Sequence, residues 1–458
     1  MTNIFCISAG QLDSKKKNST FSRKHRYLNY GLLKLASILG KHNYNPIVIH
    51  GLFDKPAHTL EICKQLEIDS NTNPILLSIP SFFALEWARE FSSQVKAFFP
   101  TKKIVVGGRW VVGNNKEWLK SYLNVDLVIP GLVDIEILNI VSALAQRNKN
   151  TAISTIQKSQ GIGARIDYRY LYERHLFQPS IEVSNGCGMG CSFCEEKDIK
   201  LSKLKSASII TEEMEALVMD DGLIEITPYL ESSMFVATEK WANELIAKRE
   251  EKGLFCKWRV ESRVDKLKVK NIPALAKAGL KVLDLGLESA SHIQLERMKK
   301  TNDPSGYLAA ASELIQAASD NGIWVKANIL LYAGETSRSI EETVSWVSKI
   351  KNHLKGVSVG PVIIYGMNGE SSRFIQEVSE YGASTIDSEV KGITHLNLSE
   401  EIDFHKSLEL SKEISCEFMS AKDFFDLKSF SYFSRDYKYS NFLNDIELVT
   451  QEEVSFKL

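Results

Sequence analysis

The sequence has few of the features that mark membrane, secreted or nucleic-acid-binding proteins. No window approaches the roughly 18 uninterrupted apolar residues that a transmembrane helix requires, and no basic segment with a following apolar stretch opens the chain, so neither a membrane helix nor a signal peptide is predicted. The formal net charge is only -1, which indicates no basic surface for nucleic acid or a membrane. The longest basic run, Lys15-Lys16-Lys17, is interpreted as a solvated loop.

Cysteine is also scarce. Seven cysteines in 458 residues are too few for the disulfide framework of a small secreted domain. Four of them stand alone and are interpreted as ordinary buried thiols: Cys6, Cys63, Cys256 and Cys416. Structural zinc often takes two separated cysteine pairs, and no second C-x2-C exists here. Neither a disulfide-stabilised nor a zinc-stabilised fold is therefore expected.

The remaining three cysteines form the most informative motif. Cys187, Cys191 and Cys194 lie in the run Ser-Asn-Gly-Cys-Gly-Met-Gly-Cys-Ser-Phe-Cys. This C-x3-C-x2-C spacing can hold three corners of a 4Fe-4S cluster, which leaves the fourth iron open for a ligand from outside the protein. The interspersed glycines let the backbone curl around a cluster. An apolar strand predicted at Ile181–Ser184 places the loop at a carboxyl end, where α/β folds carry their chemistry.

The run resembles the signature of the radical S-adenosylmethionine (SAM) enzymes. The resemblance implies that the open iron chelates the amino and carboxylate groups of SAM. An electron from a reductant such as flavodoxin or ferredoxin then cleaves SAM to methionine and a 5'-deoxyadenosyl radical. Phe193, just before the last cysteine, is expected to shield the cluster and contact SAM. Free cysteines and an oxygen-labile cluster both favour a cytoplasmic location.

The length allows two or three domains, and the pattern divides the chain into four segments. Residues 1–146 alternate apolar strands with amphipathic helices and predict a flavodoxin-like doubly wound α/β domain. Residues 147–179 are interpreted as a linker, and residues 367–458 as a mostly helical C-terminal cap over the barrel mouth. The strands predicted in the first domain are Asn3–Ser8, Pro46–His50, Pro74–Ile79, Lys103–Val106 and Asp126–Ile129. The helices located between them are Tyr30–Lys41, Leu85–Phe98, Lys116–Leu123 and Ile135–Ala145.

The first domain resembles the cobalamin-binding domains that precede the barrel in one radical SAM class. The matching segments are Tyr30–Ala36, Val105–Gly108 and Asp126–Gly131. The resemblance implies that cobalamin is held at loops after the strands, between this sheet and the barrel mouth. The implied contact residues are Ser8, Pro80, Ser81, Gly107, Gly108, Arg109 and Gly131. The motif D-x-H-x-x-G is absent, so no histidine below the cobalt is expected. The alternative is a degenerate domain kept for packing or for substrate contacts.

Residues 180–366 resume the βα alternation and predict a partial (β/α)6 barrel. Its strands are predicted at Ile181–Ser184, Leu223–Thr227, Cys256–Glu261, Val282–Gly286, Trp324–Leu331 and Gly356–Ile364. Several patches after these strands resemble SAM-binding elements of the superfamily. The patches are Thr227–Glu231, Trp258–Asp265, Leu283–Ser289 with Leu295–Lys300, and Tyr332–Thr336. The SAM-binding residues that the resemblance implies there are Thr227, Glu231, Arg263, Glu288, Ser289 and Gly334.

Alternatives remain open for several of these residues. Glu231 and Glu335 have a second interpretation as acids at helix starts, and Arg263 as part of a structural salt bridge. Arg263 could otherwise pair with the SAM carboxylate, and Glu288 could accept hydrogen bonds from SAM hydroxyls or its ammonium. Tyr365–Gly369 departs from the superfamily pattern, which implies an unusual substrate side of the pocket.

The resemblance implies a cobalamin-dependent radical SAM methyltransferase. In that class one SAM methylates cobalamin, and a second supplies the radical that activates an unactivated carbon or a phosphinate. The expected substrate is a small molecule or a peptide, with no nucleic-acid or membrane partner. The alternative is a radical SAM enzyme of rearrangement, cyclisation, or sulfur insertion or exchange. A more remote alternative is an iron–sulfur electron carrier or sensor, which would need no SAM pocket.

Overall fold

The computed structural model describes residues 2–12, 20–111, 115–131, 133–145, 165–367, 369 and 371–458. The Lys15–Lys17 run, Leu132, Gln146, most of the predicted linker (residues 147–164) and Asn368 lie outside these residues. The chain forms two compact units. The N-terminal unit comprises Met1–Phe177, Gly366–Glu370 and Glu389–Ile393, and the barrel unit comprises Gln178–Tyr365, Ser371–Ser388 and Thr394–Leu458.

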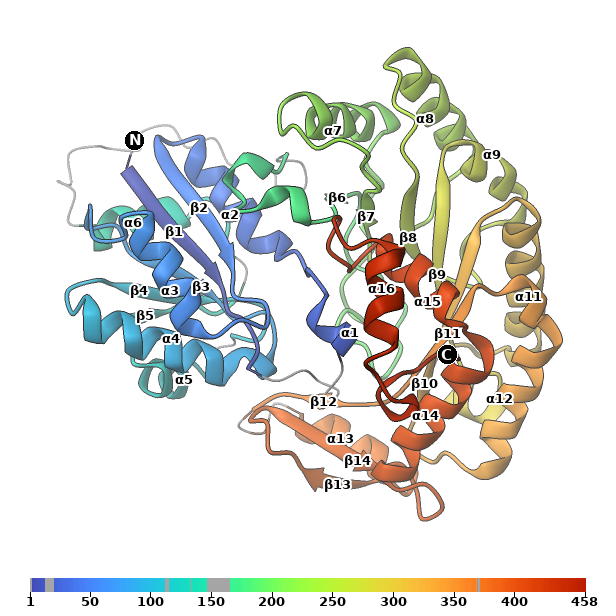
Figure 1. Cartoon of the computed structure of the whole chain (residues 1–458). Coiled ribbons are helices and arrows are strands. Elements are labelled where there is room, and N and C mark those ends of the chain that lie inside the picture. Colours follow the sequence, from blue (N-terminus) through green and yellow to red (C-terminus); the bar gives the residue numbers. More distant parts are fainter. Residues whose placement is uncertain are drawn as a thin grey trace. The chain divides into compact units, whose positions relative to one another are not determined.

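The N-terminal unit is built on a five-stranded parallel sheet with the order β2-β1-β3-β4-β5 (Figure 1). Its strands are β1 (Thr2–Ser8), β2 (Tyr44–His50), β3 (Ile75–Ser78), β4 (Ile104–Gly107) and β5 (Leu127–Val128). This order is the flavodoxin-like one, so the predicted doubly wound fold is confirmed. Every residue of β3 is buried, because helices cover both faces of the sheet.

The helices of this unit include two that the sequence analysis missed. They are α1 (Thr20–Arg23), α2 (Tyr30–Gly40), α3 (Pro56–Gln65), α4 (Leu85–Phe98), α5 (Lys116–Leu123) and α6 (Ile137–Leu144). The missed helices are α1, which is only four residues long, and α3. Helix α3 buries only Pro56, Thr59, Leu60 and Cys63, so its apolar residues are too few and too mixed to give a helical period.

The barrel unit is built on a six-stranded parallel sheet with the order β11-β10-β9-β8-β7-β6. Its strands are β6 (Ser180–Glu182), β7 (Tyr229–Glu231), β8 (Trp258–Arg263), β9 (Leu280–Glu288), β10 (Trp324–Leu331) and β11 (Gly356–Pro361). The helices along its convex side are α7 (Ala207–Met219), α8 (Glu239–Glu251), α9 (Ile272–Lys277), α11 (Pro304–Asp320) and α12 (Ser337–Ile350) (Figure 1). The short helix α10 (His292–Arg297) follows β9. The predicted partial barrel is confirmed.

One barrel strand lies at a different place from the prediction. The apolar run from Leu223 to Thr227 predicts a strand, but the strand β7 begins only at Tyr229. Ile224 is 70% exposed, and Pro228 has no backbone N–H to donate to a ladder. Thr227 therefore precedes the strand instead of ending one.

The C-terminal region lies against both ends of the barrel sheet. Its elements are β12 (Ile364–Tyr365), α13 (Ser372–Ser379), β13 (Ser384–Asp387), β14 (Ile393–Asn397), α14 (Phe404–Phe418), α15 (Ala421–Ser429) and α16 (Tyr439–Ile446). Glu377 on α13 accepts a hydrogen bond from Ser192 in the cysteine loop, at the mouth. In contrast, Phe430 contacts Trp324 at the amino end of β10. The predicted cap over the mouth is thus divided: α13 lies at the mouth, and the segment after α15 closes the floor.

Candidate active site

The three cysteines lie on a glycine-rich loop that leaves the carboxyl end of β6. Gly186, Gly188 and Gly190 all adopt positive φ, at 73°, 65° and 74°. A Cβ at Gly186 would come within 2.5 Å of the Lys200 carbonyl oxygen, so only glycine fits there. The backbone N–H of Cys187 donates to Ile199 at 2.9 Å and holds the loop closed. The predicted loop at the carboxyl end is therefore confirmed.

The donor set of this loop suits a 4Fe-4S cluster. Cys191 is buried, and Cys187 and Cys194 are half-buried. Burial raises the pKa of the Cys194 thiol, and the neighbouring Cys191 and Cys187 raise it further, which is a setting that a bound cation would reverse. In the described part of the chain, no three His, Cys, Asp or Glu side chains converge as a single metal ion would require. A cubane cluster binds each thiolate through a different iron and needs no such convergence.

A hollow of about 460 Å³ lies beside the first cysteine. It is lined by the loop itself: Cys187, Gly188, Lys197, Asp198, Lys200 and Leu201. The Met234 sulfur lies 3.9 Å from the Cys187 sulfur. The volume of the hollow leaves room beside Cys187 for a group larger than a side chain.

Arg263 links the cysteine loop to the end of β8. Its Nη1 lies 3.1 Å from the Cys191 sulfur, and its Nε donates to Asp265 at 2.9 Å. Its Nη2 donates to the Lys300 backbone oxygen at 2.7 Å. The structural salt bridge with Asp265 that the sequence analysis left open is therefore present. The same guanidinium donates towards the cysteine end, where a cluster thiolate or a SAM carboxylate would accept.

Lys300 connects four of the predicted positions, and the sequence analysis assigned it no role. Its ammonium is 3.0 Å from a carboxylate oxygen of Glu288 and 5.9 Å from the centre of the Phe193 ring. Glu288 ends β9 with φ at 68°, which a non-glycine residue adopts only under constraint. Cys191, Arg263, Glu288 and Phe193 are thus gathered around one buried lysine. The motif Arg297–Lys300 was the signal that could have identified it.

The remaining predicted SAM positions lie in three different settings. The Ser289 hydroxyl hydrogen-bonds Thr343 at 3.1 Å inside the buried turn after β9. Gly334 has φ at 78°, and a Cβ there would lie 2.3 Å from an Arg297 nitrogen. Thr227 donates to Gln178 at 2.8 Å at the amino end of β7, so the structure does not bring it to the cysteine end. Glu231, by contrast, ends β7 on the concave side of the sheet.

Two predicted helix-start acids have different roles. Thr336 caps α12 in a capping box with Ser339, as expected for this position. Glu335 lies before the cap, accepts from the Ser339 hydroxyl and is 2% exposed. Burial raises the pKa of Glu335 to about 7, with the Ser339 hydrogen bond opposing that shift. Glu231 lies on a strand and starts no helix, so that interpretation of Glu231 is wrong.

In the N-terminal unit, the predicted cobalamin loops meet at the carboxyl edge of the sheet. The Ala9 N–H donates to Ser78, and the Ile79 N–H donates to Gly107, each at 2.9 Å. Gly108 has φ at 125°, and a Cβ there would lie 2.5 Å from the Ile79 carbonyl oxygen. Only glycine therefore fits at position 108, where the loops after β3 and β4 pack closely against each other. The other positions are similarly placed: Pro80, Ser81, Arg109 and Gly131 lie in the loops that follow β3, β4 and β5.

Asn29 organises this edge, and the sequence analysis did not identify it. Its side-chain NH2 donates to the Ser8 and Ser78 hydroxyls, each at 3.0 Å. Its backbone N–H donates to His50 Nε2 at 2.8 Å. Because both serine hydroxyls accept from Asn29, their own protons remain available for a ligand beyond the sheet. An asparagine before a helix is usually a cap, which Asn29 also is, so the sequence carried no further signal.

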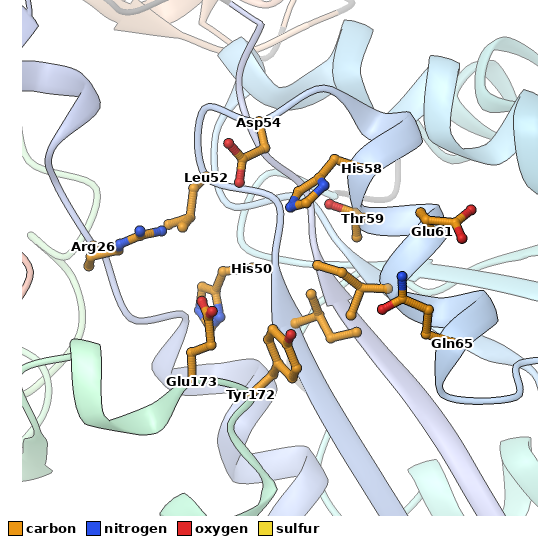
Figure 2. Close-up of a pocket in the computed structure, with 12 residues that line it drawn as sticks. Arg26, His50, Leu52, Asp54, His58, Thr59, Glu61, Gln65, Tyr172 and Glu173 are labelled. Atoms are coloured by element: carbon orange, nitrogen blue, oxygen red, sulfur yellow. The ribbon is translucent and has the colours of Figure 1, made fainter.

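A second hollow of about 370 Å³ opens at the end of β2 (Figure 2). Arg26, His50 and Tyr172 face it from one side, and Asp54 and His58 from the other. Burial, together with the smaller effect of the Arg26 charge, lowers the pKa of His50 to about 3, so the imidazole stays neutral. None of the residues predicted to contact cobalamin lines this hollow, which therefore differs from the loop cluster at β1, β3 and β4.

Comparisons with known proteins agree with this arrangement. Residues 181–347 match the sequence profile of the radical SAM superfamily. The chain is 27% identical over 187 residues to the anaerobic magnesium-protoporphyrin IX monomethyl ester cyclase of Rubrivivax gelatinosus, covering 38% of this chain and 32% of that protein. It is 25% identical over 173 residues to an uncharacterized methyltransferase of Pyrococcus horikoshii, covering 37% of this chain and 36% of that protein. The chain thus spans about a third of the length of these two curated relatives.

Two solved enzymes share the fold across both units. The radical SAM methyltransferase TsrM from Kitasatospora setae, solved with cobalamin and a 4Fe-4S cluster, matches with a TM-score of 0.59 and 15% identity over 78% of this chain and 72% of that one. The cobalamin-dependent SAM radical enzyme OxsB, solved with aqua-cobalamin, matches with a TM-score of 0.56 and 15% identity over 75% of this chain and 52% of that one. At such identities, the likeness establishes a shared fold.

Proposed function

Because this chain belongs to the radical SAM superfamily, we propose that it is a cobalamin-dependent methyltransferase for an unactivated carbon or a phosphinate of a small-molecule or peptide substrate. The observation that carries the proposal is the combination of two sites in one chain. The cysteine loop ends a barrel strand, and a glycine-rich edge ends the sheet of a flavodoxin-like unit. TsrM and OxsB, which have this combination of folds, were both solved with cobalamin bound.

The residues of the barrel unit have distinct tasks in this proposal. Cys187, Cys191 and Cys194 would hold the cluster, which supplies the electron that cleaves SAM. Arg263 donates towards the cluster end and stabilises negative charge there, because its guanidinium is buried and its planar fork presents several N–H groups. Glu288, held by Lys300, presents carboxylate oxygens to the SAM ammonium or hydroxyls.

Exclusion of water is a further task of the barrel mouth. Phe193 packs edge-on against Tyr332, with ring centres 6.4 Å apart, and Tyr332 also contacts Phe374 of α13. These rings cover the cysteine loop from the side on which Glu377 holds Ser192. A dry site strengthens the hydrogen bonds of Arg263 and keeps a reactive radical from solvent.

The test is anaerobic reconstitution of the chain with iron and sulfide, with and without added cobalamin. The proposal expects cluster absorbance in both samples, corrin absorbance only in the second, and S-adenosylhomocysteine together with 5'-deoxyadenosine during turnover. The corrin should show a base-off spectrum, because the sequence supplies no D-x-H-x-x-G histidine. SAM cleavage by protein that binds no corrin would refute the methyltransferase.

A second candidate keeps the radical step and omits methylation. It is favoured by the match to the anaerobic magnesium-protoporphyrin IX monomethyl ester cyclase of Rubrivivax gelatinosus, which covers 38% of this chain. A cyclisation or rearrangement would produce 5'-deoxyadenosine without S-adenosylhomocysteine. The ratio of the two products in one assay therefore separates the candidates.

A further inference from the structure

The concave face of the barrel sheet carries charged side chains, although its strands are central. Val260, Leu283 and Val325 point the other way and are fully buried beneath the helices. The polar and charged residues on the concave side of β8 to β10 are Arg259, Glu261, Arg263, Asp284, Lys326 and Asn328. Arg259, Arg263 and Asp284 are buried, whereas the Glu261 side chain is 43% exposed in the middle of a six-stranded sheet. Glu261 is therefore accessible to a ligand from outside the chain.

Ion pairs connect the charged residues of this face. Arg259 pairs with Asp284 and lies 3.3 Å from Glu261, and Lys326 lies 3.0 Å from Asp284. Asp284 is thus held by two cations, whereas Glu261 shares only one of them. The negative charge of Glu261 is therefore less fully neutralised than that of Asp284, and the Glu261 side chain is also partly exposed to solvent.

Arg259 is unusual because part of its guanidinium has no partner. It is 1% exposed and lies between the rings of Tyr229 and Tyr432, at 4.5 and 5.1 Å from their centres. Its Nε and Nη1 have no hydrogen-bond partner among the described residues. Buried N–H groups are rarely left unsatisfied, so an oxygen from outside the chain is the natural acceptor for them.

Carboxylates outnumber cations where β7 and β8 end. Glu231 lies level with Glu261, and Glu182 on β6 lies level with Glu231. Burial raises the pKa of Glu231 to about 7, and the Glu261 charge adds to that effect against Arg259. Burial likewise raises the pKa of Glu261, as does Asp284, against Arg259 and Lys326. Two carboxylates that repel each other in this way gain most from a bound cation.

We propose that Glu231 and Glu261 bind the protonated amine of the substrate on this face, while Arg259 hydrogen-bonds an oxygen beside that amine. The substrate class is then an α-amino acid unit, either free or at the start of a peptide. Glu261 precedes Arg263 by two residues on the same face, which places the amine roughly 7 Å along the strand from the level of Cys191. The side chain of the substrate can thus reach the cofactor end. The inference rests on the proposed function, because it takes this barrel as the site of the reaction.

The test uses the reconstituted full chain and three matched probes: phenylalaninamide, phenethylamine and N-acetylphenylalaninamide. Saturation-transfer NMR titrations with SAM present should give phenylalaninamide the lowest Kd, phenethylamine a higher one, and the acetylated probe one at least about tenfold higher than phenylalaninamide. Glu261→Gln and Glu231→Gln should each remove most of the preference for the amine. Glu244→Gln, an exposed carboxylate on α8, is the matched control and should bind all probes as the parent does.

A measurement on the unaltered chain covers the case in which a variant does not fold. Phenethylamine binding should weaken as the pH falls from 8 to 5.5, since the carboxylates become protonated while a simple alkyl amine stays charged over this range. Equal affinities for the amine and acetylated probes, no binding of any probe, or a pH-independent Kd would overturn the inference. SAM binding and cleavage are measured on the same samples, so a failure of the proposed function is seen separately from a failure of amine recognition.

Discussion

In the N-terminal sheet β1, β3 and β4 are buried and mostly apolar on both faces, whereas in the barrel sheet β8, β9 and β10 bury one face and carry charges on the other. The run Ile4–Ile7 shows the first arrangement, since all four side chains are at most 1% exposed. Glu261, between the buried Val260 and Ser262, shows the second. A sheet covered on both faces can bind a ligand only at its edge, and a sheet covered on one face can bind it along the strands.

Because of this difference, we expect the two units to bind different kinds of ligand. The N-terminal edge offers backbone and small side chains: Gly108, Ser8 and Ser78 suit a large flat ligand that needs close approach and few charges. The concave face of the barrel sheet offers charged groups at fixed positions along the strands, which suits a small ligand that must be held in one orientation. Four substitutions test this division, and we order them by the size of the expected effect.

The largest effect is expected for Cys191→Ala, which removes one cluster ligand at the barrel mouth. We expect the loss of the cluster absorbance and of all measurable SAM cleavage, because two thiolates cannot hold the cubane against solvent. Iron and sulfide analysis and a 5'-deoxyadenosine assay measure both. Cys256→Ser, at a half-buried thiol outside the loop, should retain the cluster. Retained iron and cleavage in the Cys191 variant would place the cluster elsewhere.

The second effect concerns the edge of the N-terminal sheet. Gly108→Ala places a Cβ 2.5 Å from the Ile79 carbonyl oxygen at φ 125°, so we expect a loss of about 2–3 kcal/mol in unfolding free energy and weakened corrin binding. Gly107→Ala is the matched control for stability, because its Cβ would lie 3.7 Å from the nearest atom. Chemical denaturation and corrin absorbance after gel filtration measure the two effects. Equal behaviour of the variants would mean that the edge tolerates side chains.

Much of this division could be predicted from the sequence, where the signal is local. The strand Trp324–Leu331 is predicted to the residue, since its apolar and polar positions alternate and turn residues flank it. The cysteine loop and Glu288 follow from motifs within a short stretch of chain. The ion pairs could not be predicted, because they join residues that are distant in the sequence. Arg259 pairs with Asp284 and Lys300 pairs with Glu288, and no local hydrophobic pattern indicates either contact.

The errors have local causes as well. The strand predicted at Leu223–Thr227 does not form, because Ile224 is exposed although Leu223 and Ile226 are buried, and because Pro228 has no N–H to donate to a ladder. The helix α3 was missed because too few of its residues are apolar. The split of the C-terminal region between mouth and floor depends on contacts such as Phe430 with Trp324, which composition alone does not reveal.

The third effect concerns Glu288 at the barrel mouth. Glu288→Gln keeps the shape of the side chain and removes its charge, so we expect SAM affinity to fall by about 1.5–3 kcal/mol, or roughly ten- to a hundredfold in Kd. Equilibrium dialysis with labelled SAM under anaerobic conditions measures this. Lys300→Met should show a similar loss, because that lysine orients the carboxylate. If SAM affinity is unchanged in both variants, the SAM site does not include this pair.

The smallest effect is expected on the concave face, in the pH dependence of stability. The pKa of Glu231 is raised in the folded chain from its ordinary 4.5 to about 7, first by burial and then by the charge of Glu261. The folded state therefore holds this proton more tightly than the unfolded state. The stability it contributes is fully present below pH 4.5 and is lost as the pH rises through 7.

Glu231→Gln should remove that loss, because the amide stays neutral at every pH. Relative to the parent, the variant should gain on the order of 1 kcal/mol in unfolding free energy between pH 5 and pH 8. Urea denaturation at both pH values measures the difference, and Glu244→Gln on the exposed side of α8 should leave the parent's pH slope unchanged. If Glu231→Gln retained that slope as well, Glu231 would be ionised at neutral pH like a surface acid. The concave face would then be solvated like the outer surface, and the two sheets would differ only in whether helices cover both faces or one.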